Sequence, residues 1–304
     1  MNDIFDIIII GGGPAAMGAI QYLDFNHPLK VLILSDKPIG EFVYNSIKTH
    51  DTIDGLFFYE GKKPEQLINF YNKLIITKKI DYKIDFIKNI IKSDNLFILK
   101  GSQSKYISRQ VLIATGMQNK MYKSYANYEN VLYLAGKLSK SDLNNKICVV
   151  IGGRNSGTAA AIYLSKLCKT VYLIEQKSKL MCKQKYLDRL SLRKNIITVV
   201  NVKDINLIKK TKLQIKSISL TTPEKNIIID LDYILVYIGL TPNSNLVNSI
   251  CKLDKIGYII TDNHNETSCK GLFAAGDVTG RLSQIITCHG DGANAIYWIQ
   301  KNIN

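Results

Sequence analysis

Two glycine-rich stretches in the sequence have the residue types that bind the phosphates of a nucleotide. The first is GGGPAA at positions 11–16, which follows an apolar run and fits the pattern G-x-G-x-x-G/A. Gly11 permits a tight turn, Gly13 lets backbone amides approach a pyrophosphate, and Ala16 lets a strand and a helix pack closely. The amino terminus of the following helix would face the phosphates. We therefore predict a dinucleotide site here, with a structural glycine turn as the alternative.

The residues at the end of the next apolar run are candidates for holding the adenosine ribose. An acidic residue at this place commonly accepts hydrogen bonds from the ribose hydroxyls of a bound dinucleotide. Here the place is shared by Ser35 and Asp36. Either side chain could serve, because a hydroxyl and a carboxylate are both hydrogen-bond acceptors.

The second glycine-rich stretch, GGRNSG at positions 152–157, departs from the pattern at one position. Gly152 keeps the turn and Gly157 keeps the close helix packing, but Arg154 occupies the middle position. A side chain there obstructs the approach of backbone amides to a pyrophosphate. An arginine can instead bind phosphate from the side. The sequence leaves both possibilities open for a dinucleotide.

Three further residues belong to this second candidate site. Asn155 and Ser156 follow Arg154 at the start of the expected helix, and Glu175 ends the next apolar run. A carboxylate at that place suits the 2'-hydroxyl of NADH and repels the 2'-phosphate of NADPH. We therefore expect NADH to be favoured over NADPH.

The six cysteines include no C-x-x-C pair, so the sequence predicts neither a zinc ribbon nor a local redox disulfide. We expect no metal site. Cys288 and His289 are adjacent near the start of the last expected helix, where a helix amino terminus lowers the pKa of a thiol. Both are candidate catalytic residues. Because neighbouring residues on a helix point about 100° apart, simple packing is the alternative.

Buried strands and helices must position these residues. Residues 4–10 form a continuous β-branched apolar run, as in a parallel strand that is buried on both faces. A helix from 14 to about 24 and a strand at 30–34 complete a βαβ unit, and short strands between about 81 and 113 return the chain to the sheet. The same plan recurs as a strand at 147–151, a helix at 155–168, a strand at 170–175 and a closing strand at 233–239.

The sequence therefore predicts an α/β fold with two Rossmann-like three-layer dinucleotide-binding domains, the second inserted into the first. The segment at 271–280 and the final helix from about 283 to 300 have no third βαβ unit to join, so we expect them to return to the first domain. The first domain is expected to comprise residues 1–118 and 244–304, and the second to comprise residues 119–243.

The composition indicates a globular protein without a membrane or nucleic-acid role. The 304 residues are 46% hydrophobic and carry a formal net charge of +15. No apolar stretch reaches membrane-spanning length and no export signal is visible, so we expect a cytoplasmic protein. The lysines are spread along the chain with no nucleic-acid motif among them, which favours a solvated basic surface or attraction to an acidic protein partner.

Four short motifs occur in an order that resembles the flavoprotein disulfide reductases with two dinucleotide-binding domains. They are GGGPAA at 11–16, ATG at 114–116, IGLTPN at 238–243 and FAAGDV at 273–278, interrupted by the second glycine stretch. The length and the absence of a dimerisation domain narrow the resemblance to the low-molecular-weight thioredoxin-reductase-like family. The resemblance covers nearly the whole chain. It implies FAD as the cofactor and a homodimer.

The resemblance assigns roles to residues in the matching motifs. Asp277 matches the Asp of the family's GD motif, which binds the ribityl and pyrophosphate region of the flavin, and Gly276 gives close backbone approach. Gln284 and Ile285 match the helix start beside the flavin ring, where a helix dipole stabilises the anionic reduced flavin. The residues assigned to FAD are Gly11, Gly13, Pro14, Ala15, Ala16, Ser35, Asp36, Thr115, Gly116, Gly276, Asp277, Gln284 and Ile285.

The segment at 45–67 resembles the flavin-flanking segment of short members of this family. His50 matches the histidine of that segment, which is followed by a glycine and then by a proline before a helix. A histidine near a flavin can transfer protons. The alternative is a hydrogen-bonding residue in the wall of the site.

Thioredoxin reductases of this family place a C-x-x-C pair just before the second glycine loop, where its thiolate exchanges electrons with the flavin and a substrate disulfide. The corresponding stretch, 130–153, contains one cysteine, Cys148. The resemblance without this pair implies an FAD-dependent oxidoreductase that passes electrons from NAD(P)H or another donor to a non-disulfide acceptor, such as ferredoxin, flavodoxin or a small molecule. The alternatives are a flavin oxidase or dehydrogenase of a small metabolite with a vestigial nicotinamide domain, and a non-catalytic flavin-binding partner protein.

Overall fold

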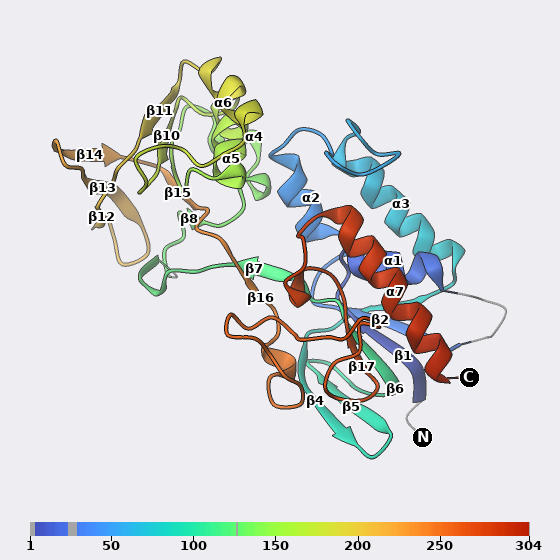
Figure 1. Cartoon of the computed structure of the whole chain (residues 1–304). Helices are drawn as coiled ribbons and strands as arrows, with labels where there is room; N and C mark the ends of the chain where they lie inside the picture. The colour runs from blue at the N-terminus through green and yellow to red at the C-terminus, as the bar shows by residue number, and fades with distance from the viewer. Residues whose placement is uncertain (1–3, 24–28, 126, 304) are drawn as a thin grey trace. The chain divides into compact units, whose positions relative to one another are not determined.

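The computed structural model describes residues 4–23, 29–125 and 127–303 (Figure 1). Contacts between residues divide this described part of the chain into two compact units. The first takes the residues up to Tyr44, Thr52–Gln118 and the residues from Thr241 onward, and the second takes Asn45–Asp51 and Asn119–Leu240.

The first unit is built on a mostly parallel sheet, which in the described residues runs in the order β3-β2-β1-β6-β5-β4, with β17 also paired to β6. In β1, the side chains of Ile7, Ile8 and Ile9 are fully buried, as the apolar run predicts for a strand covered on both faces. The strands of this sheet are β1 (Ile4–Ile10), β2 (Val31–Ser35), β3 (Asp81–Ile84), β4 (Ile87–Ser93), β5 (Leu96–Gly101), β6 (Lys105–Ile113) and β17 (Leu272–Ala274).

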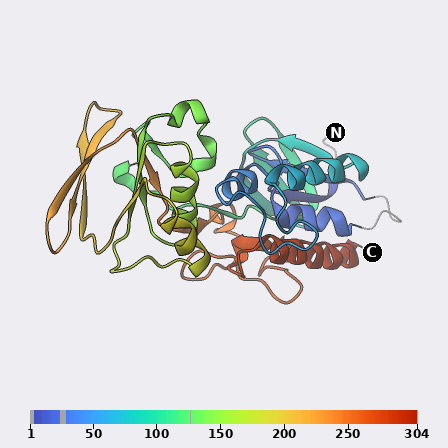
Figure 2. The same cartoon turned by 90° about the horizontal axis from the view of Figure 1, so that it is seen from above.

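Two helices from opposite ends of the first unit's sequence, α1 (Pro14–Tyr22) and α7 (Ile285–Ile303), lie side by side (Figure 2). Glycines make this close approach possible. A Cβ atom on Gly18 would lie 2.1 Å from the carbonyl oxygen of His289, and one on Gly292 would lie 1.9 Å from that of Ala15. The described residues of the first third of the chain also form α2 (Glu41–Lys48) and α3 (Pro64–Thr77).

The second unit repeats the plan on a smaller parallel sheet, with the order β11-β10-β9-β15-β8 in the described residues. Its strands are β8 (Val131–Leu132), β9 (Ile147–Ile151), β10 (Thr170–Ile174), β11 (Ile196–Val199) and β15 (Tyr233–Val236). An antiparallel sheet adds β12 (Asp204–Lys209), β13 (Ile215–Thr221) and β14 (Asn226–Asp230). The helices are α4 (Lys140–Leu143), α5 (Asn155–Ser165) and α6 (Gln184–Ser191).

The remaining elements are short. The strands β7 (Met117–Asn119) and β16 (Leu240–Pro242) pair as a separate two-stranded sheet where the chain passes between the units. The 3-10 helices are η1 (Lys123–Tyr125), η2 (Ala135–Lys137), η3 (Asn245–Val247) and η4 (Gly276–Thr279).

The predicted fold class is confirmed, whereas several predicted element ends are wrong, two of them by three residues. The helix expected at 155–168 ends at Ser165, because the chain must turn before β10 begins at Thr170. The strand expected at 233–239 ends at Val236, and Gly239, with a φ of +108°, leaves the extended region.

Candidate functional site

The first glycine loop contains one glycine that the fold requires and one that keeps space open. Gly11 has a φ of +118°, and a Cβ atom on it would lie 2.2 Å from the carbonyl oxygen of Ala114. Gly13 has a φ of −90°, which any residue adopts, and a Cβ atom on it would meet no described atom within 4 Å. Gly13 therefore leaves clear the space in which a dinucleotide pyrophosphate would approach the backbone.

The helix α1 starts directly at this open space. Pro14 occupies its first turn and Gly13 is its N-cap, with no side chain capping the helix among the described residues. Its first backbone N–H groups are thus available to an anion. Ala15 and Ala16 are buried, and their small side chains let the helix lie close to its neighbours.

The two candidates for holding a ribose differ in their availability. Ser35 is buried at the end of β2, and its Oγ atom accepts a hydrogen bond of 3.3 Å from the backbone N–H of Lys37. The Asp36 side chain is 49% exposed, with its carboxylate 3.7 Å from the Lys37 ammonium group. Of the two, the carboxylate of Asp36 is more open to a ligand.

The ATG motif is tied to the IGLTPN motif by reciprocal hydrogen bonds. Thr115 donates its hydroxyl to the carbonyl oxygen of Asn243 at 2.7 Å, and the Asn243 side-chain amide donates to the Thr115 carbonyl oxygen at 2.9 Å. Gly116 has a φ of +62°, and a Cβ atom on it would meet no described atom within 4 Å. Like Gly13, Gly116 keeps open a place where a ligand can approach the backbone.

Asp277 is held in place by two neighbouring side chains at the start of the last helical segment. It accepts hydrogen bonds from the Ser283 hydroxyl at 2.8 Å and from the Cys288 thiol at 3.1 Å. Gln284 and Ile285 lie between these two residues, at the amino terminus of α7. The structure thus brings the predicted flavin residues Asp277, Gln284 and Ile285 together at one helix start.

The environment of Cys288 does not favour a reactive thiolate. Burial and the neighbouring carboxylate of Asp277 raise the pKa of the Cys288 thiol. A thiol that donates its proton to a carboxylate is not the nucleophilic form. The geometry therefore supports the packing role for Cys288 rather than the catalytic one.

His289 is also engaged within the protein. Its Nε2 atom lies 2.7 Å from the hydroxyl of Tyr71, a fully buried side chain on α3, and the two rings meet edge to face. Burial lowers the pKa of His289 from 6.5 to about 4, because the surrounding protein disfavours the charged imidazolium. His289 is thus neutral at physiological pH and links α7 to α3.

The partly buried His289 makes acid destabilise the protein. The unfolded chain binds a proton at His289 more readily than the folded chain, so the free energy of unfolding should fall as the pH drops from 6.5 towards 4. The pKa difference corresponds to a loss of about 3 kcal/mol. Urea unfolding across this pH range measures it, with His289→Gln as the comparison. An unchanged slope in that variant would show that other groups cause the acid sensitivity.

The second glycine loop keeps the packing glycines of the first. Gly152 has a φ of +114°, and a Cβ atom on it would lie 2.1 Å from the carbonyl oxygen of Tyr237. A Cβ atom on Gly157 would lie 1.9 Å from the carbonyl oxygen of Gly152. The strand, turn and helix of a dinucleotide-binding loop are therefore preserved around Arg154.

Arg154 is the N-cap of α5 and is exposed. Its guanidinium group has no hydrogen-bond or ion-pair partner among the residues that the structure describes. The next two residues differ: Asn155 accepts a hydrogen bond of 2.9 Å from the backbone N–H of Lys183, whereas Ser156 is exposed. An unpaired cation at a helix amino terminus offers a phosphate both a charge and free N–H groups.

The carboxylate of Glu175 is hydrogen-bonded to the second glycine loop. One carboxylate oxygen accepts the backbone N–H of Gly153 at 2.7 Å, and the other accepts that of Lys177 at 2.9 Å. The carboxylate thus lies at the end of β10 and against the loop, where an acidic residue meets a ribose in dinucleotide-binding folds.

His50 follows the end of α2 and belongs to the second compact unit. Its Nδ1 atom lies 3.1 Å from the carbonyl oxygen of Ser46 and 3.2 Å from the hydroxyl of Thr49. These local contacts fix the orientation of the ring. Its predicted role beside the flavin stays a prediction.

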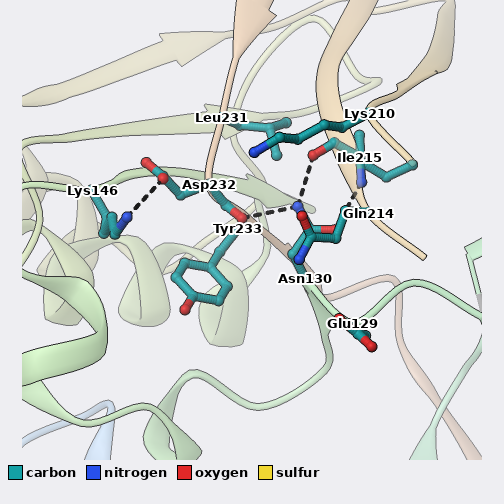
Figure 3. A pocket seen from close by; sticks show the side chains of 9 residues that line it. All are labelled: Glu129, Asn130, Lys146, Lys210, Gln214, Ile215, Leu231, Asp232 and Tyr233. Atoms are coloured by element: carbon teal, nitrogen blue, oxygen red, sulfur yellow. Dashed lines mark hydrogen bonds and ion pairs between the residues drawn. The ribbon is translucent and has the colours of Figure 1, made fainter. Parts of the chain in front are cut away.

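A polar pocket of about 380 Å³ lies elsewhere in the second unit (Figure 3). Its polar lining includes Glu129, Asn130, Lys146, Lys210, Asp232 and Tyr233. Lys146 forms an ion pair of 3.0 Å with Asp232, just before the amino ends of β9 and β15. The glycine loop follows the carboxyl end of β9, so this pocket is not the predicted nucleotide site.

Sequence reasoning missed the side chains that hold the predicted site residues. Ser283 orients Asp277, Asn243 binds Thr115, and Tyr71 binds His289. Two of them had a signal, because Asn243 lies in the IGLTPN motif and Ser283 directly precedes the predicted residue Gln284. Tyr71 had none, because it lies 218 positions from His289.

Two glycine loops, each between a buried parallel strand and a helix, define a protein with two dinucleotide-binding folds. The family model described as pyridine nucleotide-disulphide oxidoreductase matches residues 5–292. The chain belongs to this family. It is an FAD-dependent oxidoreductase of the thioredoxin-reductase-like type, whose members use NAD(P)H. The predicted family, enzyme class and FAD cofactor are confirmed.

Relatives of similar length match the chain from end to end. The thioredoxin reductase of Mycoplasma genitalium is 27% identical, with 99% of this chain and 96% of the relative covered. A "34.2 kDa protein in rubredoxin operon" of Clostridium pasteurianum is also 27% identical, with 98% and 97% covered. The crystal structure of T. acidophilum thioredoxin reductase has a TM-score of 0.87 at 27% identity and covers 99% of both chains.

No helix in the described residues is long and apolar enough to cross a membrane.

Proposed function

We propose that this protein passes electrons from NADH through FAD to an acceptor that is not a disulfide. One observation carries the proposal: the sequence contains no C-x-x-C pair. Cys148, the one cysteine in the stretch before the second glycine loop, is fully buried in β9. Cys148 lies near the amino end of β9, whereas the second glycine loop follows the carboxyl end of this strand. Cys168, which contacts Cys148, is also buried. Neither sulfur is available to a substrate disulfide.

The first unit's residues fit the role of holding FAD. Gly13 and Gly116 keep the backbone accessible to a ligand. Asp36 offers an exposed carboxylate to the adenosine ribose. The hydrogen bond from Ser283 holds the carboxylate of Asp277 in one orientation. The amino terminus of α7 supplies a positive helix dipole, which favours negative charge on a reduced ring. When bound, FAD supplies a group that takes a hydride and passes its electrons on.

The second unit's residues support NADH as the donor. Glu175 lies at the end of β10 with both carboxylate oxygens fixed by backbone N–H groups. A fixed carboxylate accepts hydrogen bonds from a 2'-hydroxyl and repels a 2'-phosphate. We therefore propose a preference for NADH over NADPH.

Arg154 supplies a direct test of the second site. If its free guanidinium binds the pyrophosphate, Arg154→Ala should weaken NADH binding about tenfold, the cost of losing a charge-assisted hydrogen bond. Calorimetric titration with NAD+, which carries the same pyrophosphate but cannot reduce the flavin, measures the Kd. Lys169→Ala, which removes an exposed positive charge beyond the other end of α5, should leave it unchanged. Tighter binding by Arg154→Gly would instead mean that the side chain obstructs the site.

The acceptor we propose is an acidic electron-carrier protein such as ferredoxin or flavodoxin. The net charge of +15 attracts an acidic partner over a long range. The Clostridium pasteurianum relative, named for its place in a rubredoxin operon, supports an electron-carrier partner. A homodimer and a cytoplasmic location are predictions from the family resemblance and from the sequence.

Anaerobic mixing of the holoprotein with NADH and with NADPH tests this function. We expect NADH to bleach the yellow flavin within seconds and NADPH to act more slowly. Bleaching by a reduced carrier protein or a metabolite, but by neither nucleotide, would favour the oxidase or dehydrogenase alternative. A flavin that stays oxidised with every reductant would leave only a non-catalytic role.

A further inference from the structure

Two cysteines that are distant in sequence contact each other inside the second unit. The Sγ atoms of Cys148 and Cys168 lie 3.3 Å apart, and both residues are free thiols. Cys148 is on β9, whereas Cys168 follows α5 and precedes β10. The two residues are separated by the second glycine loop and the whole of α5.

The fold itself brings these sulfurs together. β9 and β10 are neighbouring parallel strands, with Cys148 opposite Val171. Cys168 lies three residues before Val171, and its backbone N–H donates to the carbonyl oxygen of Leu164 at 2.8 Å, which holds the turn in place. A disulfide has an S–S length of about 2.0 Å, so bonding requires the sulfurs to move together by roughly 1 Å.

The surroundings of the pair are apolar and give the two thiols different exposure. Both belong to a core cluster with Leu143, Leu164 and Leu173. Cys148 is fully buried, whereas Cys168 retains 8% of its surface at the turn, beside the exposed Lys169. The hydrogen bond from Cys148 lowers the pKa of Cys168. Cys168 is therefore the sulfur that a small oxidant reaches first, and Cys148 is the sulfur poised to react with it.

We propose that Cys148 and Cys168 form an internal disulfide when the protein meets hydrogen peroxide. The Cys168 thiolate attacks a peroxide oxygen, the O–O bond breaks, and the sulfur becomes a sulfenic acid as water leaves. The Cys148 sulfur then attacks the Cys168 sulfur, forming the S–S bond and releasing a second water. The two thiols lose two hydrogen atoms, and one hydrogen peroxide is reduced to two waters.

This disulfide would act as a redox-sensitive latch on the nucleotide-binding unit. It joins residues 148 and 168 covalently, and the loop that it closes contains the second glycine stretch and α5. A cross-link across a loop of this length restricts the unfolded chain and stabilises the fold. Formation of this disulfide does not depend on which nucleotide the protein binds, nor on which acceptor receives its electrons.

Peptide mapping of the intact native protein tests the latch. The protein is treated with hydrogen peroxide until Cys182, a partly exposed cysteine outside the pair, is fully oxidised, and is then denatured and alkylated. We expect a peptide pair joined through Cys148 and Cys168, lighter by two hydrogen atoms than the two thiol peptides together. Dithiothreitol should release it, and the oxidised protein should unfold at a higher temperature than the reduced one.

Matched variants separate the latch from general oxidation. Cys182→Ser should keep the cross-linked peptide, whereas Cys168→Ala should lose both this peptide and the increase in unfolding temperature. Two alkylated thiols at positions 148 and 168 after Cys182 has reacted would overturn the proposal. A sulfinic or sulfonic acid at Cys168 without a cross-link would overturn it as well.

Discussion

Replacing Gly13 with valine is expected to give a folded protein that binds FAD much more weakly. The backbone at Gly13 suits any residue, and a side chain there meets no described atom of the protein within 4 Å at its Cβ position. The valine would instead fill the space beside the amino terminus of α1, where the pyrophosphate must approach. A steric conflict of about 1 to 3 kcal/mol lowers FAD affinity by roughly fivefold to 150-fold. The flavin absorbance per protein after purification measures this loss.

Gly11→Ala provides the contrasting variant. Its Cβ would lie 2.2 Å from the Ala114 carbonyl oxygen, so this change should destabilise the fold as well as reduce the flavin content. Gly13→Val should match the FAD-free wild type in urea unfolding. Wild-type flavin content in Gly13→Val would contradict the assignment of the cofactor to this loop.

Replacing Gly292 with alanine should destabilise the first unit by about 3 kcal/mol, at the upper end of the usual cost of overpacking. The added Cβ would lie 1.9 Å from the carbonyl oxygen of Ala15, where α7 and α1 lie side by side (Figure 2). Backbone atoms cannot move aside as a flexible side chain can. The two helices must therefore separate, and α1 carries the predicted phosphate-binding amino terminus. Urea unfolding of the two proteins gives the difference in free energy.

Gly290→Ala is the matched control on the same helix. Gly290 is exposed, and a Cβ atom on it would meet no described atom within 4 Å. Alanine is a better helix former than glycine, so this variant should be as stable as the wild type or more stable by up to about 1 kcal/mol. Equal destabilisation by both substitutions would show that the helix contact at Gly292 is not the cause.

The parts of the fold that repeat locally in the sequence were predictable. A β-branched run, a glycine loop and a helix follow one another within 20 residues, so β1 and α1, and likewise β9 and α5, could be found by pattern alone. The insertion of the second half into the first followed from chain connectivity. The end of α5 was less certain, because the residues after Ser165 show no proline or glycine stop signal.

The contacts that tune the candidate site could not be read from the sequence, because they join residues that are far apart. Tyr71 and His289 are 218 positions apart, and nothing in either segment indicates that the tyrosine hydroxyl reaches the imidazole. Cys148 and Cys168 lack any recognised spacing, yet adjacent parallel strands bring them into contact. Cys288 has the helix position of a reactive thiol, but burial beside Asp277 raises its pKa instead.

Anaerobic titration of the holoprotein with NADH tests most directly whether electrons reach FAD without a protein disulfide. The Cys148→Ala variant is suited to this measurement, since it cannot form the internal latch. We predict that one equivalent of NADH per FAD bleaches the flavin completely and that no new thiols appear. Consumption of a second equivalent per FAD before bleaching is complete, together with the release of two thiols, would contradict a flavin enzyme that lacks a redox disulfide.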